Sequence, residues 1–144
     1  MKVLLDTSVL VAALIETHPR HSRAFTWLHK AQQREINLII SSHTLAELYA
    51  ILTSLPLSPR IAPPAARRLI NDSVTPWAKV IPLSASDYQA TIKDLAESGI
   101  TGGAIYDALI ARAAMQGGAE KLVTLNAEDV KRVAPKMAGA IEEP

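Results

Sequence analysis

Three carboxylates, Asp6, Glu47 and Asp107, stand apart from the other acidic side chains of this protein. Asp6 ends the apolar run 3–5, and burying its charge among such neighbours would cost several kcal/mol without compensation. We therefore expect Asp6 just past the carboxyl end of a buried strand, where open α/β sheets place their ligands. A second or third carboxylate at that edge would create a site for a cation.

Asp107 has no basic partner within its own predicted helix, 104–116. The residues three and four positions away are Gly103, Ala104, Ile110 and Ala111, and none of them can pair with a carboxylate. The partner must come from elsewhere. A divalent metal is one candidate, and a distant arginine or amide is the alternative.

Glu47 has two interpretations. The segment 44–47 fits a capping box, in which the Glu47 carboxylate would accept a hydrogen bond from the Thr44 amide. Glu47 also lies one turn after the predicted strand 37–41, and neighbouring parallel strands bring their following turns to the same edge of a sheet. The second interpretation places Glu47 beside Asp6, and we favour it.

Asn126 and Thr124 end the predicted strand 121–126 and should reach the same edge. Asn126, or Asp129 one helical turn later, is expected to complete the acidic set through a direct or water-mediated contact. A simple strand-ending turn is the alternative.

Oxygen ligands without cysteine or histidine at matching spacing suit Mg²⁺ or Mn²⁺ and argue against zinc. The four histidines are scattered and are interpreted as surface or capping residues. Magnesium held by few carboxylates keeps several waters, one of which can act as a nucleophile while the metal neutralises charge on a phosphoryl oxygen. The chemistry that best matches this set is phosphodiester hydrolysis.

Alternating strands and helices must position these side chains. Buried strands are predicted near 3–5, 37–41, 79–83 and 121–126, with a short one around 138–141. Helices are predicted at 9–14, 23–33, 44–54, 65–70, 86–96 and 104–116, with a short one in the tail. Pro82 favours an edge or terminal position in the sheet, and Trp27 is assigned to the core. The alternation predicts an α/β fold whose mostly parallel sheet has helices on both faces.

The 144 residues suit a single domain, 1–144, with 49% hydrophobic and 20% charged residues. The absence of cysteine excludes disulfides, thiolate metal sites and a cysteine nucleophile. No signal peptide and no membrane-spanning run is readable, so a cytoplasmic protein is expected. The net charge of +1 means that a polyanion would have to be held by a local patch.

Four motifs occur in a characteristic order: Leu-Leu-Asp-Thr-Ser at 4–8, Thr-Leu-Ala-Glu-Leu at 44–48, the segment 102–111 around Asp107, and Val-Thr-Leu-Asn at 123–126. In these motifs the sequence resembles the PIN-domain ribonucleases, and more narrowly the VapC-type toxins of type II toxin-antitoxin pairs. The resemblance implies a three-layer α/β/α sandwich, endonucleolytic cleavage of RNA with Mg²⁺ or Mn²⁺, a homodimer, and a cognate antitoxin that inserts a peptide into the cleft.

The resemblance also assigns roles to particular residues. Asp6, Glu47 and Asp107 match the acidic triad of the family, with Asp6 and Asp107 as direct metal ligands. Glu47 would bind the metal or orient its water. Asn126 stands where the family often has a fourth acidic residue, which places a second metal site in doubt.

Two other functions were weighed. Phosphatases with an aspartyl nucleophile need a second Asp two residues after the first, where this sequence has Ser8. A catalytically degenerate PIN-like domain would bind RNA or protein without cutting. RNA could meet a basic margin, among whose candidates Arg112 ranks first because it follows Asp107 on one helix. The other candidates are Arg20, Arg23, Lys30, Arg34, Arg67 and Arg68.

Overall fold

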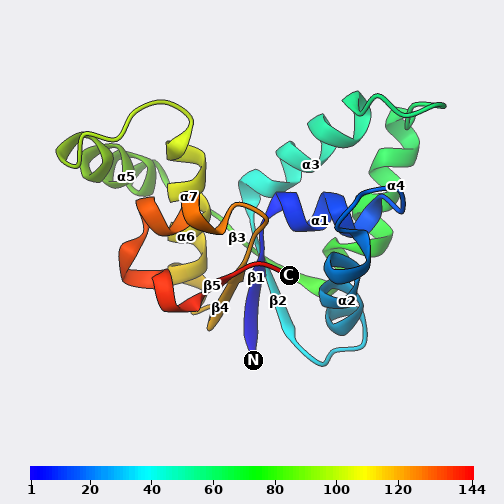
Figure 1. Ribbon diagram of the computed structural model, residues 1–144, viewed down its shortest axis with the longest axis horizontal. Coiled ribbons are helices and arrows are strands. Elements are labelled where there is room, and N and C mark those ends of the chain that lie inside the picture. Colours follow the sequence, from blue (N-terminus) through cyan, green and yellow to red (C-terminus); the bar gives the residue numbers. More distant parts are fainter.

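A five-stranded sheet, parallel throughout, forms the centre of the structure, a computed structural model that describes residues 1–144 (Figure 1). Its strands are β1 (Lys2–Leu5), β2 (Asn37–Ser41), β3 (Ala78–Ile81), β4 (Lys121–Val123) and β5 (Ile141–Glu142), in the spatial order β3-β2-β1-β4-β5. The first strand of the chain is therefore the middle strand of the sheet. The predicted edge position of the third strand is confirmed.

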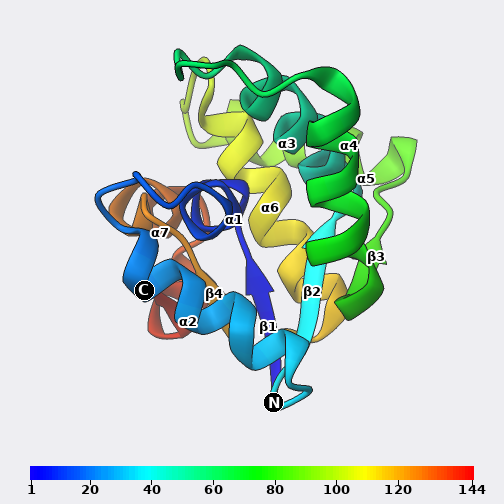
Figure 2. The same ribbon diagram turned by 90° about the vertical axis from the view of Figure 1, so that its right-hand side faces the viewer.

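Helices cover both faces of this sheet. They are α1 (Thr7–Leu14), α2 (His21–Gln32), α3 (Ser42–Ser54), α4 (Pro63–Ser73), α5 (Ala85–Glu97), α6 (Ala104–Gly117) and α7 (Ala127–Val133). Short 3₁₀ helices occupy Thr75–Trp77 and Pro135–Ala140. Figure 1 shows α1 to α4 on one side of the sheet and α5 to α7 on the other, and Figure 2 views the side that α2 and α4 cover. The predicted three-layer α/β/α sandwich is confirmed.

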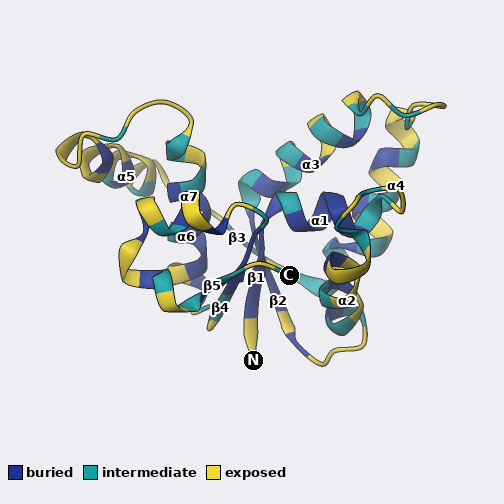
Figure 3. Ribbon diagram, in the orientation of Figure 1, coloured by how far each residue is buried: buried dark blue, intermediate teal, exposed yellow.

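Each face of the sheet has its own apolar core, because successive side chains of a strand point to opposite faces. Val3 and Leu5 of β1 pack with α1 to α4, whereas Leu4 packs with α6 and α7. Trp27 is partly buried against the first core. Figure 3 shows the central strands buried along most of their length and α5 largely exposed. A strand buried on both faces must be apolar throughout, which explains the uninterrupted run before Asp6.

Several element boundaries differ from the prediction, and at two of them side chains take over backbone groups. The fourth strand ends at Val123, not at residue 126. Beyond it, the Leu125 amide donates to Ser8 Oγ (3.1 Å) and the Asn126 amide donates to Thr124 Oγ1 (3.1 Å), so neither amide continues the strand ladder. Similarly, α1 begins at Thr7, two residues before the predicted start at residue 9, with Asp6 as its N-cap.

No helix in the structure combines the length and the apolar character that crossing a lipid bilayer requires.

Candidate active site

Asp6 is held in one orientation at the carboxyl end of β1. Its Oδ1 accepts a hydrogen bond from the Thr7 amide (2.7 Å), and its Oδ2 accepts from Ser8 Oγ (3.1 Å) and Thr124 Oγ1 (2.8 Å). The residue is only 6% exposed. Burial raises the pKa of the Asp6 carboxyl, and the three hydrogen bonds oppose that rise. The strand, the N-cap and the neighbouring strand β4 together fix this carboxylate.

Glu47 lies on the first turns of α3, whose start stands above the end of β2 in Figure 1. Its Oε1 accepts from Thr7 Oγ1 at 3.4 Å and lies 3.4 Å from His43 Nε2. Burial is the main cause that raises the pKa of Glu47, and the charge of Asp6 adds to it, whereas His43 and the Thr7 hydroxyl lower it.

The capping-box alternative for Glu47 does not occur. The helix starts three residues earlier than that motif requires, with Ser41 as its N-cap, because Ser41 Oγ accepts from the His43 amide (3.3 Å). Thr44 is fully buried, and its hydroxyl accepts from Thr7 Oγ1 (3.2 Å). The Glu47 side chain is thus free of a capping role and turns toward Thr7.

Asp107 lies half-buried in the first turn of α6. The pKa of Asp107 is raised from 3.8 to about 6. Burial is the largest cause of this rise, and the charges of Asp6, Asp129 and Glu47 contribute the rest. Arg132 opposes this rise, but no hydrogen bond does. The four acidic side chains therefore lie within electrostatic reach of one another.

One cavity of about 190 Å³ joins these side chains. It is lined by Asp6, Thr7, Ser8, Glu47, Ile51, Tyr106, Asp107, Ile110 and Asn126. The structure thus brings Asp6, Glu47, Asp107 and Asn126 to one place, from the N-cap of α1, from α3 and α6, and from the N-cap of α7. Their catalytic and metal-binding roles remain predictions.

No group of three or more carboxylate or imidazole side chains lies close enough together to enclose a metal ion. A closed cage is not what Mg²⁺ needs, because one or two carboxylates commonly bind it while it keeps several waters. The donor set here is oxygen only, and two of its carboxyls carry pKa values raised first by burial and further by neighbouring negative charge, a repulsion that a cation would relieve. The residues of the cavity therefore fit a hydrated Mg²⁺ or Mn²⁺ ion.

Two side chains of the site were not found from the sequence. His43 pairs with Glu47, and its ring stacks on Tyr106 with centroids 5.5 Å apart and planes 7° from parallel. His43 had been interpreted as a surface or capping residue. Its spacing, four residues before Glu47 on one helix, was an available signal for the contact with the carboxylate, but not for the contact with Tyr106.

Arg112, the preferred candidate for binding RNA, is engaged elsewhere. Its Nε donates to Asp87 Oδ1 (3.1 Å) across the contact between α6 and α5. Asp87 also forms the capping box of α5 with Ser84. Hydrogen bonds from the Ser84 amide and then from Arg112 lower the pKa of Asp87 to about 2. The Arg112 side chain thus ties two helices together.

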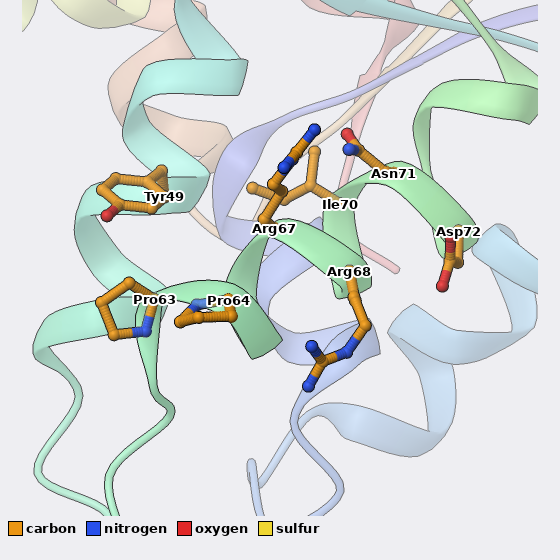
Figure 4. Close-up of a pocket in the computed structure, with 8 residues that line it drawn as sticks. All are labelled: Tyr49, Pro63, Pro64, Arg67, Arg68, Ile70, Asn71 and Asp72. Carbon is orange, nitrogen blue, oxygen red and sulfur yellow. The ribbon is translucent and has the colours of Figure 1, made fainter.

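Arg67 and Arg68 line a larger cavity, of about 670 Å³, between α3 and α4 (Figure 4). Figure 4 shows their side chains leaving α4 in different directions, and Asp72 is the single acidic residue of the lining. This cavity holds no cluster of carboxylates, so the smaller one remains the candidate for chemistry.

The PIN domain family matches residues 3–136 of the chain. Ribonuclease VapC27 of Mycobacterium tuberculosis is 40% identical over 116 residues, which cover 81% of this chain and 79% of the relative. Ribonuclease VapC40 of the same organism is 38% identical over 117 residues, 81% of each protein.

Solved structures share the fold. VapBC2 from Rickettsia felis, bound to a DNA fragment from their promoter, superimposes with a TM-score of 0.69 and 24% identity, covering 100% of this chain and 99% of the other. FitAcB from Neisseria gonorrhoeae gives a TM-score of 0.66 and 19% identity, covering 92% and 93%. With its match over nearly the whole length and its VapC relatives, this chain belongs to the PIN domain family, in the group of VapC ribonucleases.

Proposed function

We propose that this protein is a metal-dependent endoribonuclease that hydrolyses RNA phosphodiester bonds, and that it is the toxin of a type II toxin-antitoxin pair. The observation that carries the proposal is the meeting of Asp6, Glu47 and Asp107 around one cavity in a chain of the PIN domain family. The names of its relatives, both ribonucleases, support the same activity.

In the proposed mechanism Asp6 and Asp107 would hold a Mg²⁺ or Mn²⁺ ion. When bound, this ion supplies a Lewis acid for the phosphoryl oxygen and lowers the pKa of a water molecule. Thr124, Ser8 and the Thr7 amide keep the Asp6 oxygens pointing into the cavity, which reduces the reorganisation needed on binding.

Glu47 either binds the ion or accepts a proton from the attacking water. The raised pKa of Glu47 brings its basicity closer to neutral pH than that of an ordinary glutamate, which suits a proton acceptor. Asn126, exposed at the start of α7, offers an uncharged amide to the substrate or to a bound water. A second cation would need a further negative charge, which this amide does not supply, so we propose one metal site.

An antitoxin partner follows from the same proposal. VapBC2 from R. felis was solved with a DNA fragment from their promoter. We infer that this chain likewise has a cognate antitoxin, which inserts a peptide into the cleft, and that it acts as a homodimer in the cytoplasm.

The test is RNA cleavage by the purified protein with Mg²⁺, with Mn²⁺ and with EDTA. Cleavage is expected with either metal and not with EDTA. Asp6→Asn and Asp107→Asn are expected to abolish cleavage because each removes a metal ligand, with the fold kept. Asp94→Asn, on the exposed face of α5, is the matched control and should cut like the parent. Intact RNA under both metals would overturn the proposal and indicate a degenerate binding module.

A further inference from the structure

Tyr106 is an exposed aromatic side chain at the rim of the carboxylate cavity. It is 53% exposed, more than Phe25 (42%), Tyr49 (46%) or Tyr88 (37%). It is also the single aromatic residue that lines this cavity. Because the ring is open to solvent at the rim of the candidate active site, it is available to stack on a ligand that enters the cavity.

The Tyr106 ring is fixed in place before any ligand arrives. Its inner face stacks on His43 at 5.5 Å, with the two planes 7° apart. His43 itself is held by Glu47, 3.4 Å away, and the Tyr106 amide donates to Gly103 O (3.1 Å) in the first turn of α6. Since His43 comes from α3 and Tyr106 from α6, two helices hold the ring, while about half of the residue stays exposed.

Exposed aromatic rings of this kind bind unpaired bases. Single-stranded RNA is recognised largely by stacking its bases on aromatic side chains, whereas a paired base has both faces covered by its neighbours. Tyr106 and Asp107 line the same cavity, so a phosphate held there by a cation on the carboxylates would bring an adjoining nucleotide to the ring. Ile51 and Ile110 add apolar surface to the same cavity.

We propose that Tyr106, backed by His43, is a base-stacking residue that receives an unpaired base beside the scissile phosphate. This inference rests on the proposed ribonuclease function and deepens it by adding a base-binding subsite. Stacking is tolerant of base identity because every base has a π face, so the subsite selects unpaired nucleotides without selecting a sequence.

A purely structural role is the rival explanation, in which Tyr106 only clamps α3 to α6 through His43. The two differ in how a Tyr106 variant responds to the substrate. A lost clamp lowers thermal stability and affects every substrate alike. A lost stacking partner affects only substrates that carry the stacked base.

The test is a double-mutant cycle between protein and RNA. A single-stranded oligonucleotide with one mapped cleavage site is prepared intact and with an abasic residue on either side of the scissile bond. KM and kcat are measured for the parent and for Tyr106→Leu, Tyr106→Phe and Tyr106→Trp. Tyr49→Leu is the matched control, because Tyr49 is similarly exposed but lines the other cavity. Thermal unfolding of each variant checks its fold.

On the intact RNA, Tyr106→Leu is expected to raise KM by roughly 5- to 150-fold with a much smaller change in kcat. Phe and Trp at this position should keep a KM near that of the parent, as should Tyr49→Leu. The parent should bind one of the two abasic RNAs more weakly than the intact RNA, by a similar factor. Tyr106→Leu should bind that abasic RNA no more weakly than it binds the intact RNA. This lack of additivity is the signature of a direct contact.

The stacking contact would be overturned if the effects of Tyr106→Leu and of the abasic residue on KM multiplied when the two changes are combined. A KM for Tyr106→Leu equal to that of the parent would overturn it too. A Phe variant as weak as Leu would also overturn it, since that result assigns the role to the hydroxyl. If the parent cuts no RNA with either metal, the proposed function fails separately. The same cycle is then measured as oligonucleotide binding by fluorescence anisotropy, with the same expected coupling.

Discussion

Asp107→Asn is expected to make the metal-free protein more stable at neutral pH while destroying its activity. The Asp107 carboxyl has a pKa raised from 3.8 to about 6 in the folded protein, so the folded state holds its proton more tightly than the unfolded chain does. For this group, folding is favoured most below pH 3.8, and that advantage is lost as the pH rises through about 6. Asparagine, which is never charged, removes the penalty at every pH.

The size of the effect follows from the shift of the pKa. A rise from 3.8 to about 6, at about 1.4 kcal/mol per unit, corresponds to at most about 3 kcal/mol. Because Asp107 is only half-buried, solvent screening reduces that figure, and the variant also loses a favourable charge at the N-terminus of α6. We expect a net gain of about 1 kcal/mol at pH 7.5, equivalent to a rise in Tm of roughly 4 °C.

Urea unfolding in EDTA, followed by the fluorescence of Trp27 and Trp77, measures this gain at pH 7.5 and at pH 4. The difference between variant and parent should vanish at pH 4, where Asp107 is protonated. Asp94→Asn serves as the control, and its free energy of unfolding should match that of the parent at both pH values. An Asp107→Asn variant that is no more stable than the parent at pH 7.5, or whose gain persists at pH 4, would refute the electrostatic reasoning.

Added Mg²⁺ should make the parent more stable than Asp107→Asn, the reverse of their order in EDTA. A ligand at ten times its Kd stabilises the folded state by about 1.4 kcal/mol, and Asp107→Asn lacks one of the proposed ligands. The parent should therefore gain from added Mg²⁺ and the variant should not, which separates a metal ligand from an acidic residue that is merely crowded.

Two further predictions concern side chains around the cavity and away from it. Thr124→Val keeps the shape of the side chain but removes the hydroxyl that donates to Asp6. Urea unfolding should therefore show a loss of about 2 kcal/mol in the free energy of unfolding, which Thr124→Ser should largely restore. An unchanged midpoint would mean that this hydrogen bond does not hold Asp6. Arg112→Ala should leave the initial rate of RNA cleavage at the parent level, because its guanidinium pairs with Asp87; a large rise in KM would restore Arg112 to the RNA-binding margin.

The parts of the fold that follow from local pattern were predictable. β2 spans the predicted residues 37–41, since a strand buried on both faces appears as an unbroken apolar run. The position of Asp6 followed from the same reasoning, because a carboxylate after such a run has to lie beyond the strand. Parallel order then brought the turn after β2 to the edge that holds Asp6, which placed Glu47 in its neighbourhood.

Contacts between distant elements were not predictable in the same way. The stack of His43 on Tyr106 depends on how closely the starts of α3 and α6 approach, and no pattern within either helix encodes that distance. The pairing of Arg112 with Asp87 likewise depends on the packing of α5 against α6. The N-cap of α1 was not predictable either, because Asp6, Thr7 and Ser8 are all of types preferred at N-caps and only the end of the strand decides among them.

The order of the strands determines when the candidate active site can form during synthesis of the protein. β1 precedes β2 and β4 in the chain but sits between them, and the hydroxyl that steers Asp6 belongs to Thr124, 118 residues further along the chain. A nascent chain therefore carries Asp6 long before the side chain that orients it has been synthesised. On the proposed function, a chain whose synthesis stops before Thr124 lacks this hydrogen bond, so the nuclease site is complete only once residue 124 has been added.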